Sequence, residues 1–248
     1  LKSLTIPESV TKIGRGAFYD CTALEKIQVP KSLTNIAELA FYNCMGLADE
    51  NGFVFVNDGL YYYGGTAAEV AIPDGTTCIG GGAFIRGRNL TSIKIPDSVT
   101  YIGNEAFQQC TNLTSIDLPD SVTHIGEGAF YECSGLTSIV SNAVVPPALG
   151  NEVFTNPNSC NVTVPCGSLE AYTSSQWNNY FPNRIEDDCS SALQEVESTR
   201  EFVVYPNPAR GKVVFDKAVE RVEVIDLSGK TLQTYENANE INMETLPA

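Results

Sequence analysis

Side chains that most often carry catalysis are sparse in this chain of 248 residues. Any histidine-dependent triad would have to be centred on His124, the single histidine. It shares its place in a 23-residue repeat with Lys12, Asn35, Cys78 and Tyr101, and we expect that column to face solvent. The chain has no phosphate-binding glycine loop, HExxH motif or EF-hand loop. We therefore predict no enzymatic activity, no cofactor and no bound metal.

Carboxylates offer little more chemistry. A glycosidase needs two of them facing one cleft. Among strand positions predicted to face outward, only Glu69 and Asp117 are acidic, and they lie two repeats apart in different columns. The pairs Asp49-Glu50 and Asp187-Asp188 fall in predicted loops, where solvated charges are a simpler interpretation than calcium ligands. A hydrolase is thus disfavoured.

A period of 23 residues organises the first part of the chain. The unit reads Φ-x-Φ-P-x-x-Φ-T-x-I-G-x-x-A-F-x-x-C-x-x-L, where Φ is apolar. Its phenylalanines are Phe18, Phe41, Phe84, Phe107 and Phe130. The step between equivalent prolines is 23 except from Pro30 to Pro73, where it is 43 because about 20 residues are inserted. Such a period is typical of a solenoid. We predict that equivalent side chains stack about 4.8 Å apart and form a hydrophobic spine.

Each coil should contain two short strands and a turn. Residues 113–119 alternate apolar and polar side chains, as a half-buried strand does, and proline ends the strand. Residues 122–126 form a second extended piece, whose glycine we expect to let the chain turn. Residues 129–136 return inward through a compact or helical turn. The outward strand positions are small, mixed in charge and without aromatics, so a solvated face is expected there rather than a ligand groove.

The run Leu-Thr-Ser-Ile-x-Φ-Pro-x-Ser-Val-Thr-x-Ile-Gly-x-x-Ala-Phe-x-x-Cys resembles the leucine-rich repeat of BspA-like bacterial surface proteins. Five coils match it within residues 1–140. The resemblance implies a β-rich leucine-rich-repeat solenoid with short helical turns, used for adhesion or surface binding. Two positions depart from the pattern, because Ala37 replaces the glycine and Gly87 replaces the cysteine.

The insertion, residues 48–71, reads as a hairpin with a turn at Asn57-Asp58-Gly59. Strand alternation places Phe53 and Phe55 on one face, and the other face is apolar too. Aromatic protrusions suit recognition because they bring large contact area at little entropic cost. The candidate binding residues are Phe53, Phe55, Tyr61, Tyr62 and Tyr63. The alternative is that the hairpin packs against the flank of the solenoid.

Residues 141–188 lose the period, and we predict that they cap the solenoid. A short helix from about Ser168, with Leu169, Tyr172 and Trp177 turned inward, would cover the last coil. BspA-like proteins often end in a similar passage. We interpret Trp177 as cap core rather than as a sugar-stacking platform.

Residues 189–200 form a polar linker, and residues 201–248 resemble the C-terminal sorting domain of type IX secretion substrates, a small all-β sandwich. The matching features are the Tyr-Pro-Asn-Pro-Ala-x-Gly opening, the Val-x-Val-Ile-Asp-Leu-Ser-Gly-Lys centre and the terminal Leu-Pro-Ala. We expect strands at 212–215, at 221–226 and from Thr231. The family usually continues with a further strand, so we expect a truncated sandwich with an exposed edge. The resemblance implies a Bacteroidetes-like protein that engages the secretion machinery and is extracellular or at the outer cell surface.

The eight cysteines separate by position. Cys21, Cys44, Cys110 and Cys133 share the repeat column, where neighbouring side chains point the same way, so we expect buried free thiols. Cys78 is expected to be an exposed thiol. Three lie around the cap, and an extracellular location permits a bond. We expect a disulfide between Cys166 and Cys189, with Cys160 as the rival partner.

Net charge is −15, and every part of the chain is acidic, which argues against nucleic acid or anionic membrane as partner. No apolar run is long enough to span a membrane. The chain begins in mid-repeat at Leu1, and we expect further coils upstream. We predict a secreted or cell-surface non-catalytic adhesion protein that presents a rigid surface to a protein or glycan of host or neighbouring cells. The alternative is a structural spacer that holds an upstream module away from the cell.

Overall fold

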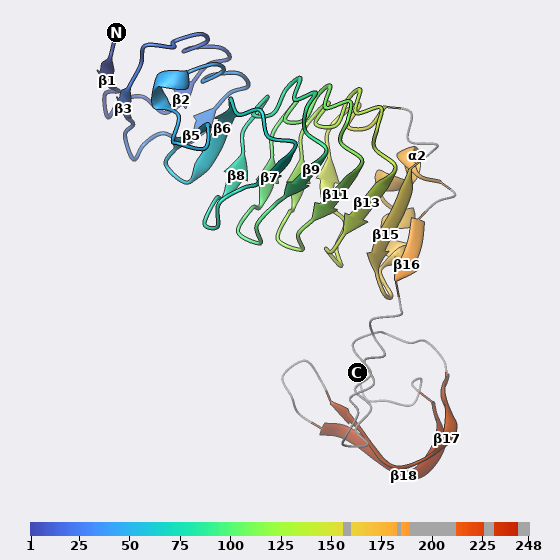
Figure 1. The fold of residues 1–248 in the computed structure, drawn as a ribbon. Coiled ribbons are helices and arrows are strands. Elements are labelled where there is room, and N and C mark those ends of the chain that lie inside the picture. The colour runs from blue at the N-terminus through green and yellow to red at the C-terminus, as the bar shows by residue number, and fades with distance from the viewer. Residues whose placement is uncertain (156–159, 183–184, 189–211, 226–230, 243–248) are drawn as a thin grey trace. The chain divides into compact units, whose positions relative to one another are not determined.

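The computed structural model describes residues 1–155, 160–182, 185–188, 212–225 and 231–242. They belong to two compact units, Leu1–Asp188 and Cys189–Ala248. Figure 1 shows the first as a stack of coils, with each chain turn lying beside the next.

Two lines of short parallel strands run along the first unit. The first line contains β1 (Ser3–Thr5), β3 (Lys26–Gln28), β7 (Glu69–Ala71), β9 (Ser92–Lys94), β11 (Ser115–Leu118), β13 (Ser138–Ser141), β15 (Asn161–Pro165) and β16 (Ile185–Asp188). The second contains β2 (Lys12–Ile13), β4 (Asn35–Ile36), β8 (Cys78–Ile79), β10 (Tyr101–Ile102), β12 (His124–Ile125) and β14 (Ala148–Leu149). Tyr101 pairs with His124 and Ser115 with Ser138, so the strand register equals the sequence period. The predicted solenoid is confirmed.

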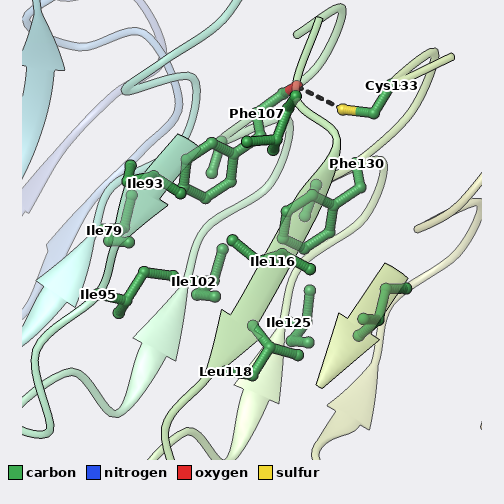
Figure 2. Packing of buried hydrophobic residues seen from close by; sticks show 14 of the residues in the cluster. Ile79, Ile93, Ile95, Ile102, Phe107, Ile116, Leu118, Ile125, Phe130 and Cys133 are labelled. Carbon is green, nitrogen blue, oxygen red and sulfur yellow. Dashed lines mark hydrogen bonds between the residues drawn. The ribbon is translucent and has the colours of Figure 1, made fainter. Parts of the chain in front are cut away.

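Equivalent phenylalanines form the predicted spine. The ring centroids of Phe18 and Phe41 lie 5.1 Å apart, those of Phe84 and Phe107 5.1 Å, and those of Phe107 and Phe130 5.2 Å. All but Phe18 are buried. Figure 2 shows the rings of Phe107 and Phe130 side by side above rows of isoleucine side chains. Stacking of like on like fills the interior at every coil with the same shapes.

Side-chain hydrogen bonds tie each coil to the one before it. The thiols of Cys110 and Cys133 donate to the carbonyl oxygens of Phe84 and Phe107 over 3.2 and 3.0 Å (Figure 2 shows the second). Hydroxyl groups do the same on the other side of the coil; the pairs are Thr34 with Thr11, Thr100 with Thr77, Thr123 with Thr100, Ser98 with Thr76, and Ser121 with Val99. Most of these carbonyls, such as those of Thr77 and Phe107, also accept a backbone N–H, so the side-chain bonds are additional links between neighbouring coils.

The repeated glycine after the second strand has a different cause from the one predicted. A Cβ added to Gly103 would lie 2.5 Å from the backbone nitrogen of Gly81, and one added to Gly126 would lie 2.5 Å from that of Asn104. Neither glycine has a positive φ angle. Close approach between neighbouring coils, and not a special turn, therefore excludes a side chain here.

Beyond residue 140 both strand lines continue, through β14 in one and through β15 and β16 in the other. The aromatic spine continues too, because the Phe130 and Phe154 rings lie 5.4 Å apart. Helices α1 (Leu169–Thr173) and α2 (Trp177–Tyr180) follow β15. Residues 141–188 thus add to the stack as well as covering it, although the sequence predicted that the period is lost here.

The two helices bring the predicted aromatic core inward. Tyr172 and Trp177 are fully buried, whereas Leu169 is half-buried. The Tyr172 hydroxyl lies 2.7 Å from the Ser141 Oγ and donates to the Ala143 carbonyl, and burial raises the pKa of Tyr172 to about 12. The Trp177 indole N–H donates to the Pro147 carbonyl over 2.9 Å. Every polar edge of these rings is satisfied, which makes Trp177 a core residue.

In the second unit, β17 (Lys212–Ile225) and β18 (Thr231–Asn242) form an antiparallel pair. A register shift between Val214 and Val219 joins what the sequence predicted as two strands into β17. The predicted opening motif at 205–211, the turn at 227–230 and the terminal Leu-Pro-Ala lie outside the described residues.

Candidate binding surface around the hairpin

The inserted hairpin consists of β5 (Phe53–Val56) and β6 (Gly59–Tyr63), preceded by the 3-10 helix η1 (Met45–Leu47). Its second strand pairs in parallel with β8, Leu60 opposite Ile79, and so occupies the place of a coil strand in the second line. The Asp49 carboxylate accepts hydrogen bonds from the backbone N–H groups of Asn51 and Phe53 and shapes the turn into β5. The hairpin is therefore built into the stack.

Most of the candidate binding residues lie against the core. Phe53 is 5% exposed, and Phe55, Tyr61, Tyr62 and Tyr63 are half-buried. The two faces serve different clusters, as strand alternation predicts: Phe53 and Phe55 pack with the coils that follow, and Val54 and Val56 with the coils that precede. These side chains are packed, as in the alternative prediction, but within the stack rather than on its flank. Binding by the hairpin residues stays a prediction.

Aromatic rings of the hairpin carry the spine across the insertion. The Tyr61 ring lies edge-on to Phe41 at 6.0 Å, and the Tyr63 ring lies 5.3 Å from Phe84. Phe53 packs against Tyr63 at 4.9 Å. Side chains of the insertion thus fill the gap in the aromatic stack between Phe41 and Phe84.

Tyr61 also corrects the prediction for Cys78. Its hydroxyl lies 3.8 Å from the Cys78 sulfur, and the thiol is half-buried rather than exposed. Burial raises the pKa of the Cys78 thiol, and burial raises that of the Tyr61 hydroxyl as well. The insertion covers a column that faces solvent elsewhere, which the pattern of a single coil does not reveal.

A row of three tyrosines includes the hairpin residue Tyr62 and ends in an exposed ring. The Tyr19 and Tyr42 rings stack at 4.7 Å with an interplanar angle of 14°, and the Tyr62 ring lies 5.0 Å from Tyr42. Tyr19 is 48% exposed. Beside the row, the Asn43 amide donates to the Asp20 carboxylate over 2.9 Å. We use the name tyrosine row for the three tyrosines together with Asp20 and Asn43.

The pKa of Tyr62 reflects the polar groups gathered in this row. Burial is the main cause of a raised pKa at Tyr62, and the nearby Tyr42 hydroxyl and the Asp20 carboxylate raise it further. The raised pKa keeps the Tyr62 hydroxyl protonated, and so a hydrogen-bond donor, further into the alkaline range. Tyr19 and Tyr42 both follow the repeat phenylalanine directly and lie 23 residues apart. That spacing was the signal for the row, although only Tyr62 was among the predicted binding residues.

An open cleft of about 500 Å³ lies on another side of the hairpin. It is lined by Thr5, Ile6, Glu8, Ile27, Gln28, Val29, Pro30, Phe55, Val56 and Asn57. The ends of β1 and β3 form one wall and the hairpin tip forms the other. Phe55 is the one predicted binding residue that reaches this cleft.

Residues considered for catalysis are not brought together. His124 is exposed, and its Nδ1 lies 2.9 Å from the Thr123 hydroxyl beside it. Asp117 accepts a hydrogen bond from the Asn142 amide, and Glu69 stands two coils away on β7. Within the described ranges, no three His, Cys, Asp or Glu side chains gather as metal ligands would.

The repeat-column cysteines Cys21, Cys44, Cys110 and Cys133 are free thiols, as predicted, although Cys21 is only half-buried. Cys166 is disulfide-bonded. Its predicted partner, Cys189, lies outside the described residues, so the pairing stays a prediction. None of the helices described here has the length and apolar character of a membrane span.

Comparison with known proteins places these features in a family. Residues 1–50 and 55–181 match the BspA type leucine rich repeat region in six copies, and residues 203–248 match the secretion system C-terminal sorting domain. A comparison with curated proteins finds no match.

Solved structures of bacterial leucine-rich-repeat proteins are similar. A leucine rich cell surface protein of Faecalibacterium prausnitzii shares 24% identity over 76% of this chain and 60% of its own, with a TM-score of 0.44. A leucine rich repeat protein of T. pallidum shares 27% over 64% of each chain, with a TM-score of 0.36. The chain thus spans under two thirds of the length of either.

The sequence match covers most of the solenoid, and the sorting domain indicates secretion to the exterior or the outer cell surface. The chain belongs to the BspA-type leucine-rich repeat family of bacterial surface proteins.

Proposed function

We propose that the protein is a non-catalytic adhesin that binds a protein or glycan of host or neighbouring cells through the tyrosine row. The stacked coils hold the row rigid, because each ring rests on the ring of the coil beside it. A rigid aromatic contact loses little conformational entropy on binding. The exposed Tyr19 ring, stacked on the half-buried Tyr42 ring, is the observation that supports this function.

Polar groups beside the rings suit such a contact. The Asp20–Asn43 pair and the three hydroxyls supply donors and acceptors at the rim of an apolar surface. Aromatic centres with polar rims are typical of binding sites on proteins. The sorting domain would deliver this surface to the outside of the cell by engaging the secretion machinery through residues 201–248.

Binding of the full chain to arrays of immobilised matrix proteins and glycans tests this function. We expect Tyr19→Ala with Tyr42→Ala to weaken binding about tenfold or more, as loss of an aromatic anchor does. The matched control is Tyr101→Ala, because Tyr101 is 43% exposed on β10 and is not part of the row. Thermal unfolding of both variants shows whether the fold survives.

Equal binding by the wild type and the double variant would exclude the row as the contact. Absence of binding to every immobilised molecule would instead favour the spacer alternative, in which the solenoid only separates other modules from the cell.

A further inference from the structure

The first strand line is interrupted at the insertion, and this leaves β3 with an open edge. Among the strands that the structure describes, β3 pairs with β1 alone and β7 with β9 alone. Where the next coil would place a strand beside β3, the chain instead turns at Asp49–Gly52 into the hairpin. On this side the next coil contributes the 3-10 helix η1, which contacts β3, but among the described residues it contributes no strand that pairs with β3.

Register shows which backbone groups lie on that edge. The Lys26 N–H donates to the Lys2 carbonyl, and the Gln28 carbonyl accepts from the Ile6 N–H. Alternation along a strand then turns the N–H and C=O groups of Ile27 to the opposite edge. Among the residues that the structure describes, none hydrogen-bonds to these two groups. An unpaired strand edge is a template for another strand.

The open cleft described above lies next to this edge and could accommodate side chains of an added strand. Ile27, Val29 and Phe55 contribute apolar surface to it. A strand that pairs with Ile27 would alternate its side chains between this cleft and the solvent-facing side of β3.

Charged side chains near the open edge of β3 indicate which kind of strand would bind there. Lys2 and Arg15 are already paired with Glu25 and Glu105. In the turn beside the edge, the Asp49 carboxylate is hydrogen-bonded to backbone N–H groups. Lys26 is exposed on the outward face of β3, and Lys31 is exposed just beyond Pro30, which lines the cleft. Glu8 is the one acidic side chain in the lining. β7 also has an open edge, but its outward Glu69 would repel an acidic segment.

We propose that the open edge of β3 and the adjoining cleft bind an extended, acidic segment of a partner polypeptide, which adds to the sheet as a strand. The backbone of Ile27 supplies the pairing, the cleft takes the inward side chains, and Lys26 and Lys31 attract the acidic ones. This surface is separate from the tyrosine row, so the inference goes beyond the proposed function and stands without it.

Hydrogen exchange of the full chain tests the proposal. The probe is an acetylated and amidated octapeptide of alternating glutamate and valine. We expect saturating peptide to slow exchange of the Ile27 amide about tenfold or more, since a strand bond protects it. The same peptide N-methylated at every residue cannot pair and should give no protection, and a lysine–valine version should bind more weakly.

Side-chain variants check the charge argument. Lys26→Glu should weaken binding of the acidic peptide about fivefold to tenfold. Lys12→Glu is the matched control, because Lys12 is exposed but lies on β2 in the other strand line, and it should leave binding unchanged.

Three outcomes would overturn the proposal: no protection of Ile27 by the acidic peptide, equal binding of the N-methylated peptide, or protection that rises with protein concentration before peptide is added. The last would mean that a second copy of the chain occupies the edge. The two proposals are tested separately. Array binding by the tyrosine variants reports on the proposed function, and protection of the Ile27 amide by the peptide reports on this inference, so either can fail while the other holds.

Discussion

At the scale of single residues, the repeat cysteine does more than fill space. Each of Cys44, Cys110 and Cys133 points its sulfur at the carbonyl of the phenylalanine one coil earlier, at 2.9 to 3.2 Å. A hydroxyl would make this bond, but it costs more to bury. The carbonyl already accepts a backbone N–H of its own coil, and the weak thiol donor adds a second hydrogen bond while remaining apolar enough for the core.

Burial of these thiols makes stability depend on alkaline pH. Burial raises the pKa of Cys110 and of Cys133 from 9.0 to about 12. Between these values the unfolded chain has lost protons that the native chain keeps, so stability is intact below about pH 9 and falls as the pH rises toward 12. The expected slope is about 1.4 kcal/mol per pH unit for each thiol.

The free energy of unfolding in urea at pH 8 and pH 10 measures this effect. The variant with Cys110→Ala and Cys133→Ala should be less stable at pH 8, yet it should lose about 2–3 kcal/mol less than the wild type on going to pH 10. Equal losses in both proteins would show that the thiols do not carry the pH dependence.

At the scale of elements, the hairpin is a joint between two parts of the stack. Its apolar faces serve the two buried clusters, one formed by the coils before it and one by the coils after it. An insertion that only protruded would expose those faces. The aromatic side chains of the hairpin pack against these two clusters. The exposed aromatic surface comes instead from the tyrosine row beside the hairpin.

A substitution inside the hairpin should therefore affect folding. Leu60 is fully buried opposite Ile79, and Leu60→Ala should lower the free energy of unfolding by about 2–5 kcal/mol. The matched control is Asn57→Gly at the tip, where φ is 52° and glycine is tolerated, with a change within about 1 kcal/mol. Similar stability of both variants in urea would contradict the structural role of the hairpin.

At the scale of the whole molecule, the first unit is a quasi-linear stack whose weakest junction is the insertion. Both strand lines are broken there, and the links that remain include the Leu39 N–H bond to the Gly81 carbonyl at 2.9 Å. In solenoids, stability is nearly a sum of coil and interface terms. A poor interface therefore allows one side of the stack to open without the other.

Hydrogen exchange of the unmodified chain should detect this opening. We expect amides in β3 and β4 to exchange faster than those in β10 and β12, because opening the first coils does not require unfolding the rest. Leu60→Ala should widen the difference by weakening the joint. A single exchange rate across the unit, unchanged by Leu60→Ala, would mean that the stack opens as one body.

The 23-residue period by itself determined the solenoid, its two strand lines and its phenylalanine spine. Identical spacing forces equivalent side chains into the same layer of successive coils, so a pattern in one dimension specifies the stacking. The cap core of Tyr172 and Trp177 followed from the physical need to cover the last coil. The extension of the spine to Phe154 was hidden because its step from Phe130 is 24 residues.

Only the tertiary structure decided what the hairpin does. With both faces apolar, strand alternation does not say which face meets a core, and here each meets a different one. Contacts between neighbouring coils also explain why Tyr61 covers Cys78 and why Gly103 and Gly126 have no room for a side chain. The arrangement of the coils likewise leaves β3 with an unpaired edge. These features depend on contacts between residues far apart in the chain, which the pattern of one repeat does not contain.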